Sequence, residues 1–546
     1  MPTQKEKLEK LLGVSDPHEK NSLLDEIFND VDADVKGFFK DVSDLFISGS
    51  PAIKKVQKQT RYTWKNHTDN QVVQPLQYLT PKSYEDLVTI IKTAEANNCK
   101  VRAVGSGHSF SDVVQVNDFL INTDELCNPI PLDKTLLKDN VDTSFLIHVQ
   151  NGIKIRQLND YLDEHGLALP NMGGYDAQSI VGAASTSTHG SGITLGPISS
   201  FYKSIVLIAD GGVTYRIEPA NGITDPQKYQ AKYPGNKLIQ DDDWFNAVSV
   251  SMGCTGIIYS VILNVMPAYW LKEVRTLSDW ETVKADLTDG KVLTNNRHYE
   301  VLVNPYLVKG KHQCLVTKRN IVKKPDTPIG SKGSRNFLTT LLGLIPGMSD
   351  VFDFVFDTFP ELSPAILNEA MKGLVDDAYI DKSYKVLNLG SANNISAYSA
   401  EIAFPVKDNI FIKAVEKMFE VAAKMKTLGN LYHTCPISLR FVKASDAFLS
   451  MQNGGDTCMI EIPVVNGTFG GFDLLQHYES AMYEFHGRPH WGQVNYLTGS
   501  YDLIKRMYPG YDKWIAVYKE LNKKGTFDNQ FTDRCGFSYI NFNNQI

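Results

Sequence analysis

The sequence has 546 residues, of which 42% are hydrophobic and 21% are charged, an ordinary balance for a soluble globular protein. A chain of this length favours two or more domains, because one hydrophobic core seldom serves so many residues. The net charge of -7 argues against a nucleic-acid partner, since proteins that bind nucleic acid usually present a basic face.

Several other classes of protein and site are also disfavoured. The most apolar stretch, 337–359, is interrupted by glycine, proline and aspartate, and the N-terminal residues lack the apolar core of a signal peptide, so we expect no transmembrane segment. The seven cysteines include no CxxC pair, which favours reduced thiols in a cytoplasmic protein. No HExxH motif or Cys/His ligand spacing supports a metal site.

In chain order, residues 1 to about 60 have a charged and mostly helical pattern, which predicts a helical N-terminal arm. A helix is predicted from Ser83, an N-cap residue with Asp86 three positions on, and a strand follows at 100–104. A second helix is expected from 155 to the cap at His165-Gly166, and strands 203–209 and 213–217 predict a hairpin. This alternation predicts an α+β nucleotide-binding domain over 61–268.

After 268 the sequence up to about 390 has an irregular pattern, which we interpret as containing a lid or insertion at about 320–390. A regular series follows, with a strand at 398–404, a helix at 409–425, strands at 437–442 and 458–464, and a helix at 472–485. Short connections of this kind favour a mostly antiparallel sheet with helices on one face, here assigned to 269–485.

Two segments carry the chemical signal. Gly105-Ser106-Gly107-His108-Ser109 follows a strand, and its amides can form an anion nest suited to a pyrophosphate. The spacing is not GxGxxG, so the Rossmann fingerprint fails, and alone such a loop is more often a turn. The second segment, 179–192, consists of small and hydroxyl residues that a helix interior would seldom contain. It suits a backbone that wraps a large flat ligand.

Five ordered motifs resemble one family, namely Val101–Ser111, Pro170–Met172, Gly182–Gly192, Ser251–Ile258 and Arg488–Gly492. They are similar to the aldonolactone and alditol oxidases of the vanillyl-alcohol-oxidase superfamily of FAD-linked oxidases. The resemblance covers 61–267 closely and 395–546 more loosely. It implies an α+β fold with a two-part FAD-binding domain, an antiparallel-sheet substrate (cap) domain, and a C-terminal segment, 486–546, that returns to the flavin.

The resemblance also assigns the cofactor site. It implies that the FAD pyrophosphate is wrapped by Val104, Gly105, Ser106, Gly107, His108, Ser109 and Phe110. The flavin side would be contacted by Ser179, Gly182 and Thr186, and the adenine side by Ile258. His108 stands where the family joins a histidine to the flavin 8α-methyl, and a neutral imidazole is a competent nucleophile for that bond. His189 is expected to have only a hydrogen-bonding role in its loop.

The substrate motifs depart from the family pattern. The family's Glu-x-Arg is here Ser438-Leu439-Arg440, and its His-Trp-Gly-Lys is here His490-Trp491-Gly492-Gln493. A serine that touches polyols in alditol oxidases aligns with Gly174, and Glu461 either supplies the missing carboxylate or is a solvated strand residue. Arg440 is the leading catalytic candidate, because it can stabilise negative charge, and His490 is the next.

The expected reaction is hydride transfer from the alcohol carbon of a sugar 1,4-lactone or related polyol to flavin N5, with O2 as acceptor and H2O2 as product. By resemblance, Gly173 occupies the position that controls oxygen access, and a glycine leaves that path open. The alternatives are an oxidase of a bulkier, less polar alcohol, a dehydrogenase that uses another electron acceptor, and a catalytically dead flavin-binding protein.

Overall fold

The computed structural model describes residues 57–59, 62–331, 335–338, 340, 363–389, 396–429 and 431–538. The predicted helical arm at 1–60 lies outside these residues except for 57–59, which form a strand, β1 (Gln57–Gln59), rather than a helix. The stretch 341–362 of the predicted insertion also lies outside them.

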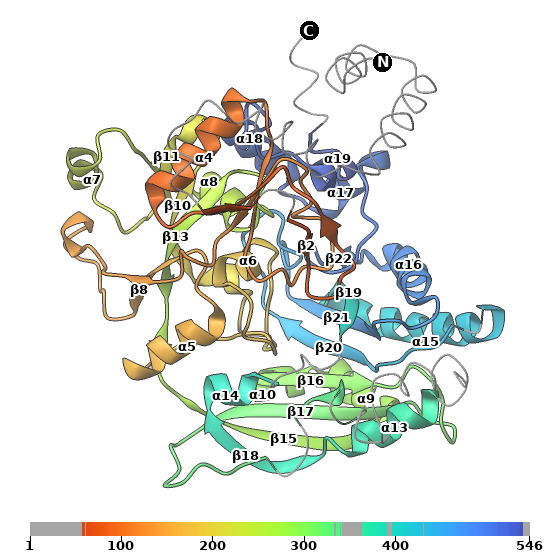
Figure 1. The fold of residues 1–546 in the computed structure, drawn as a ribbon. Coiled ribbons are helices and arrows are strands. Elements are labelled where there is room, and N and C mark those ends of the chain that lie inside the picture. Colours follow the sequence, from red (N-terminus) through yellow and green to blue (C-terminus); the bar gives the residue numbers. More distant parts are fainter. Residues whose placement is uncertain are drawn as a thin grey trace, which may run out of the picture.

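The N-terminal half contains two sheets (Figure 1). The first has four strands in the order β1, β4 (Gln77–Thr80), β6 (Phe119–Asn122) and β5 (Val101–Val104), and the last three are parallel. Helix α4 (Tyr84–Ala96) packs on it through Leu87, Ile90 and Ile91. The predicted capping box is confirmed, since the Ser83 side chain accepts from Asp86 N–H and Asp86 accepts from Ser83 N–H.

The second sheet has six strands in the order β12 (Lys237–Gln240), β11 (Thr214–Glu218), β10 (Tyr202–Ile208), β13 (Ile257–Asn264), β8 (Leu146–Gln150) and β7 (Pro129–Ile130). Strands β10 and β11 form the predicted hairpin, whose turn contains Gly211 at φ 74°. Strands β2 (Trp64–Lys65) with β3 (Val72–Val73), and β9 (Leu167–Ala168) with β14 (Met266–Pro267), form two small ribbons.

Helices pack around this second sheet. The predicted helix after Lys154 is confirmed as α5 (Ile155–Glu164), and it ends at His165, followed by Gly166 at φ 70°. The others are α6 (Ile180–Ser185), α7 (Pro226–Lys232) and α8 (Asp242–Ser249). The short helix α6 corrects the expectation that 179–192 avoids helix. Ala183 and Ala184 let it bury its face despite Gly182 and the hydroxyl residues beside them.

The C-terminal half is an eight-stranded sheet in which every described neighbouring pair is antiparallel. Its order is β18 (Asp376–Lys382), β15 (Trp270–Asp279), β17 (Gln313–Val322), β16 (His298–Val303), β20 (Ile437–Val442), β21 (Thr457–Val465), β19 (Ala397–Pro405) and β22 (Arg488–Pro489). The prediction of an irregular stretch after 268 is wrong, because 270–322 supplies three of these strands. The charged residues Glu273, Arg275 and Arg319 point inward there, and they obscure the alternation that normally identifies a strand.

Four helices cover one face of this sheet, as predicted (Figure 1), but α13 (Ser363–Lys372) packs on the opposite face, where Met371 meets Leu315. The four helices α9 (Trp280–Asp289), α10 (Lys291–Asn295), α15 (Ile410–Gly429) and α16 (Gly471–Met482) share one apolar core with the strands. Strand residues at alternate positions, such as Leu439 and Ile460, enter that core. Their neighbours Ser438, Arg440 and Glu461 must therefore face the opposite side, toward the N-terminal half.

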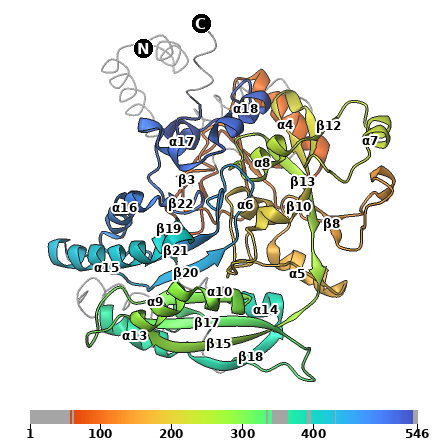
Figure 2. The ribbon, with the colours of Figure 1, turned by 180° about the vertical axis from the view of Figure 1, so that it is seen from behind.

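The remaining helices are α13 (Ser363–Lys372) and α14 (Ser383–Leu387) in the predicted insertion, and α17 (Leu503–Met507), α18 (Tyr511–Leu521) and α19 (Gln530–Arg534) at the C-terminal end. Figure 1 labels these last three, in dark blue, and Figure 2 shows α17 and α18 from behind, beside the N-terminal half rather than beside the sheet of the C-terminal half. The buried Arg102 ties them there, since its guanidinium donates to the carbonyls of Val113, Met252 and Phe527.

Candidate functional site

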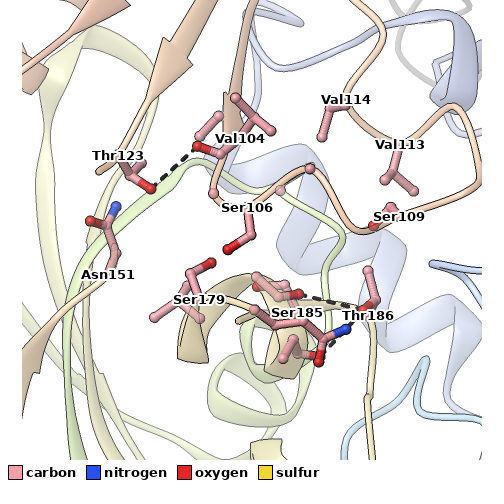
Figure 3. Close-up of a pocket in the computed structure, with 18 of the residues that line it drawn as sticks. Val104, Ser106, Ser109, Val113, Val114, Thr123, Asn151, Ser179, Ser185 and Thr186 are labelled. Atoms are coloured by element: carbon pink, nitrogen blue, oxygen red, sulfur yellow. Dashed lines mark hydrogen bonds between the residues drawn. The ribbon is translucent and has the colours of Figure 1, made fainter. Parts of the chain in front are cut away.

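A first cavity lies in the N-terminal half, between the turn after β5 and helix α6 (Figure 3). Of the residues assigned to the cofactor from the sequence, all but Phe110 line it: Val104, Gly105, Ser106, Gly107, His108, Ser109, Ser179, Gly182, Thr186 and Ile258. The structure therefore brings the cofactor candidates from three separate segments to one place. None of the described residues that line this cavity is an aspartate, glutamate, lysine or arginine.

Glycines shape this cavity by steric necessity. A Cβ at Gly105 would overlap Ser179 Oγ, and a Cβ at Gly182 would lie 2.7 Å from the same atom. Gly107 adopts φ 64°, a left-handed conformation that favours glycine, and it lies against the ring of Trp64. Figure 3 shows the hydroxyls of Ser106 and Ser179 pointing toward one another across the space so formed.

The residues of this cavity fit FAD. The absence of acidic side chains from the described lining suits an anionic pyrophosphate, because a carboxylate there would repel it. Beside Ile258, the side-chain N–H of Asn151 donates to the Ile258 carbonyl at 2.6 Å. The Oδ1 of Asn151 is buried and has no hydrogen-bond partner. A buried acceptor of this kind needs a donor, which the amino group of an adenine can provide.

A second cavity lies between the first one and the inner face of the eight-stranded sheet. The remaining sequence candidates all line it, namely Phe110, Gly174, Ser438, Arg440, Glu461, His490 and Gln493. Four residues line both cavities: His108, Ser109, Gln178 and Thr186. The two cavities therefore share a boundary, and His108 lies on it.

The environment of His108 suits a nucleophilic imidazole. Its ring contacts those of His67 and Tyr175, with ring centroids 4.3 Å away in each case, and these two rings are themselves 6.4 Å apart. Burial, together with the nearby His67 and Lys154, lowers the pKa of His108 to about 3. The imidazole is therefore neutral at pH 7 and keeps a lone pair available.

The sheet wall of the second cavity carries paired charges. Arg440 Nη1 lies 3.4 Å from Glu461 Oε2, and the Ser399 hydroxyl donates to Glu461 Oε1 at 3.1 Å. Glu461 is therefore a part-buried partner of Arg440, and the alternative interpretation as a solvated strand residue is wrong. Burial and the neighbouring Glu401 raise the pKa of Glu461, although Arg440 opposes the shift.

Behind Arg440, alternating charges continue across the sheet. Glu300 on β16 is its register partner, and the Arg319 guanidinium lies 2.7 Å from Glu300 and 2.6 Å from Glu273. Burial would raise the pKa of Glu300, but Arg319 and Arg440 outweigh it and hold the value at about 2. Arg440 thus has an ion pair with Glu461 and, on the adjacent strand, the negative charge of Glu300 as a second electrostatic partner.

Sequence reasoning missed several residues of this site, including Asn151 and Ser399, and above all Glu401 on β19. It is 3% exposed and lines the second cavity, where its Oε1 lies 3.3 Å from His189 Nε2 and its Oε2 lies 4.0 Å from His490 Nε2. The sequence did carry a signal for Glu401. It lies two residues after Ser399, so both side chains share one face of a strand whose other face is apolar. His189 also does more than its predicted loop hydrogen bond to Gly190, because it lines the cavity.

The other walls of the second cavity are mixed in character. Apolar side chains from distant segments, Leu302, Phe337, Leu338 and Leu389, line it together with the polar groups. A Cβ at Gly174 would lie 2.8 Å from Leu389 Cδ1, so a larger residue at this position requires Leu389 to move. Polar groups at one wall and apolar groups at another are typical of a small-molecule site.

Known proteins resemble this chain in sequence over most of its length. The family model "D-arabinono-1,4-lactone oxidase" matches residues 261–535, and the model "FAD binding domain" matches 75–218. The chain is 27% identical over 478 residues to an L-gulono-1,4-lactone dehydrogenase of Mycobacterium tuberculosis, covering 86% of this chain and 98% of that protein. It is 24% identical over 469 residues to L-gulonolactone oxidase of Mus musculus, covering 84% and 95%.

Solved structures agree on the fold. A cholesterol oxidase from B. sterolicum superposes with a TM-score of 0.69 over 88% of this chain and 97% of that one, at 14% identity. The predicted fold, an FAD-binding half of the vanillyl-alcohol-oxidase type with an antiparallel-sheet half, is confirmed. Among the described residues, no helix is long and apolar enough to cross a membrane.

Proposed function

Because the chain belongs to the D-arabinono-1,4-lactone oxidase family and is a FAD-linked oxidoreductase that acts on CH–OH groups, we propose that it oxidises a sugar 1,4-lactone or a related polyol with O2 as the electron acceptor. The observation that carries this proposal is the shared boundary of the two cavities at His108, Ser109, Gln178 and Thr186. A cofactor in the first cavity can expose its reactive ring to a substrate in the second only across such a boundary.

The roles of the residues follow from their positions. The backbone of 104–109 and the hydroxyls of Ser179 and Thr186 hold FAD, and Asn151 with Ile258 borders its adenine end. His108, a neutral imidazole beside the boundary, forms the covalent bond to the flavin. When bound, FAD supplies the two-electron acceptor for the hydride of the alcohol carbon.

The substrate is bound by the residues of the second cavity. Arg440, paired with Glu461, stabilises negative charge that develops on the substrate oxygen. The Ser399 Oγ lies 3.1 Å from Glu461 Oε1 and also contacts the amide of Gln493, and its single hydrogen can be donated to only one of them at a time. These hydroxyl and amide groups are the polar partners for the hydroxyls of a lactone or polyol. His490 lines the same cavity, and Gly174, which has no side chain, leaves room for the substrate there.

A second candidate, an oxidase of a bulkier and less polar alcohol, is favoured by one observation. Leu302, Phe337, Leu338 and Leu389 form an apolar wall that a small polyhydroxyl compound does not use. A dehydrogenase that uses another electron acceptor is the third possibility, and it is the activity named for the mycobacterial relative.

A substrate panel tests these possibilities. Purified protein is mixed with L-gulono-, L-galactono- and D-arabinono-1,4-lactone, with xylitol, and with hydrophobic alcohols, and both peroxide formation and dye reduction are measured. Turnover of a lactone or polyol with peroxide formation supports the proposal. Turnover of hydrophobic alcohols alone favours the second candidate, and dye reduction without peroxide favours a dehydrogenase. A flavin that no compound bleaches anaerobically would sink the enzymatic proposal.

The state of the cysteines bears on the compartment. All seven, which are described residues, are unpaired, and six of them are buried. Unpaired buried thiols are usual where the surroundings are reducing, and we propose the cytoplasm as the location of this chain.

A further inference from the structure

Three ionisable groups lie together in the second cavity and are nearly inaccessible to solvent. His189, Glu401 and His490 are 3%, 3% and 4% exposed, and one ligand atom from each lies within 4.8 Å of the others. The backbone fixes two of them, because His490 N–H donates to the Glu401 carbonyl at 2.8 Å where β22 meets β19. Three such groups can hold either a metal ion or a proton, and their hydrogen bonds decide between the two.

The hydrogen bonds of His189 require a proton between it and Glu401. Its Nδ1 lies 2.8 Å from the Gly190 carbonyl, which can only accept, so the Nδ1 carries hydrogen. A neutral His189 then has a bare lone pair on Nε2, and this atom faces Glu401 Oε1 at 3.3 Å. Two lone pairs in contact in a buried site repel each other. One proton shared between the two atoms removes this repulsion.

His490 has the opposite arrangement. The Gly492 N–H donates to His490 Nδ1 at 3.0 Å, so the single lone pair of the neutral ring is used there and Nε2 carries the hydrogen. Burial lowers the pKa of His490 to about 4, against the pull of Glu401, so the ring is neutral at pH 7. An imidazole nitrogen that carries hydrogen cannot ligate a metal, and this disfavours a metal site at the three residues.

The groups around Glu401 balance its charge. His189 and His490 face it from the N-terminal half and from the segment after β22, and Arg440, Cys458 and Glu461 face it from β20 and β21. Burial would raise the pKa of Glu401, but the charge and the hydrogen bond of His189 outweigh this effect and hold the value at about 2. Within this group Glu401 is a carboxylate, while Glu461 is shifted toward its protonated form.

Oxidation of an alcohol carbon releases a proton as well as a hydride, and the site needs an acceptor for it. His490 cannot serve, because its lone pair is used by Gly492, and Arg440 is a cation. The oxygen of Glu401 that His189 leaves unused, Oε2, belongs to a residue that lines the cavity and lies 4.0 Å from His490 Nε2.

We propose that Glu401 is the catalytic residue that accepts the hydroxyl proton of the substrate, and that His189 is a positioning residue that keeps Glu401 ionised. This inference rests on the proposed function. In the step, the C–H hydrogen leaves with both electrons of its bond toward the flavin ring, the O–H proton passes to Glu401 Oε2, and the C–O bond becomes a carbonyl. The His490 Nε2–H donates a hydrogen bond to the same substrate oxygen.

The first test compares Glu401→Gln with a matched control, Glu479→Gln. Glu479 is also a buried carboxylate, but it lies on α16, accepts from Tyr496 N–H at 3.0 Å and lines neither cavity. Anaerobic flavin bleaching by D-arabinono-1,4-lactone, or by the best compound of the panel, should slow by about 10²- to 10⁴-fold in Glu401→Gln, the usual cost of losing a general base. Glu479→Gln should keep the wild-type rate, and an unchanged rate in Glu401→Gln would overturn the proposal.

The second test covers the case in which Glu401→Gln does not fold. In His189→Leu the buried carboxylate loses its partner, so its pKa rises. The bleaching rate should then fall steeply toward acidic pH and recover toward alkaline pH, whereas the wild-type rate should be flat over about pH 5 to 9. A purely structural role for His189 would lower the rate equally at every pH, which contradicts the proposal.

A third measurement needs no substrate and so separates failure of this inference from failure of the proposed function. In the holoenzyme with isotope-labelled histidine, NMR should show His189 protonated on both ring nitrogens and His490 as the neutral Nε2–H form. Assignment uses His189→Leu and His490→Gln. A neutral His189 beside an ionised Glu401, or one equivalent of a tightly bound metal in the purified protein, would refute the inference whatever the enzyme oxidises.

Discussion

Gly105 and Ser179 lie so close together that a Cβ on the first would overlap the side-chain oxygen of the second. The contact joins the turn after β5 to the start of α6, and these are the two walls of the cofactor cavity. The width of that cavity is therefore set by the absence of one methyl group.

Gly105→Ala should consequently reduce flavin content and stability. Overpacking of a tight site costs about 1–3 kcal/mol, and here it displaces a wall of the cavity. Flavin content per protein and the melting temperature measure the effect. The matched control is Gly235→Ala, because a Cβ there meets no atom within 4 Å. A Gly105→Ala protein with full flavin content and an unchanged melting temperature would contradict this account of the cavity.

His108→Ala should release the flavin. In the native protein the yellow colour should remain with the acid-precipitated polypeptide, and in His108→Ala it should move to the supernatant, because the bond to the imidazole cannot form. His67→Ala is the control, since its ring lies beside that of His108 with centroids 4.3 Å apart and should not be needed for the bond. Flavin in the supernatant of the native protein would argue against the covalent link while leaving the fold unaffected.

Gly173→Ala should slow reoxidation by O2. Gly173 lines the second cavity, and an added Cβ would lie 3.3 Å from the His189 carbonyl oxygen, so the methyl group is accommodated with a small shift. We expect a several-fold loss of peroxide formation while dye reduction is retained, because the methyl narrows only the path of oxygen. Stopped-flow reoxidation of the reduced protein measures this, and equal loss of both activities would point to a misplaced substrate instead.

Acid should destabilise the protein through its buried neutral histidines. Burial, the largest cause, lowers the pKa of His298 to about 3, and the ring is 0% exposed with Nδ1 placed 2.7 Å from the Ser191 carbonyl. The unfolded chain binds a proton near pH 6.5 and the native one does not, so stability falls as the pH drops below about 6.5.

For His298 alone the loss between about pH 7 and about pH 5 is about 2 kcal/mol in the free energy of unfolding. Denaturant unfolding at the two pH values measures it. His298→Gln removes the titrating group, so the variant should lose less stability on acidification than the native protein, although it starts from a lower value. An identical loss in both proteins would mean that His298 does not titrate as described.

Local elements were predictable where local chemistry decides them. The Ser83–Asp86 capping box and the end of α5 at His165-Gly166 use contacts within a few residues, and both are confirmed. The domain boundary near 268 stays a prediction. The strands of 270–322 were missed because their inward residues include Glu273 and Arg319, whose charges are compensated by an ion pair between two strands.

Individual residues of the candidate site could be predicted from the sequence, but the contacts between them could not. Motif resemblance identified His108 and Arg440, whereas Glu401 belongs to no motif used, and its neighbours His189 and His490 lie some 200 and 90 positions away in the sequence. Strand pairing that joins such distant segments is set by the whole sheet. The charge relationships of Arg440 therefore required the structure.

Two hydrogen bonds join the turn after β5 to the segment after β22, and we call this contact the seam. It limits how far the two halves of the enzyme can separate. Phe110 N–H donates to the Gly492 carbonyl at 2.7 Å, and the Ser111 hydroxyl donates to the Trp491 carbonyl at 2.5 Å. Separating the halves at this seam would break both bonds and expose Trp491, which is completely buried. Phe337 and Leu389 line the second cavity without taking part in either of these bonds, and substitutions there should change the rate of product departure more than the rate of chemistry.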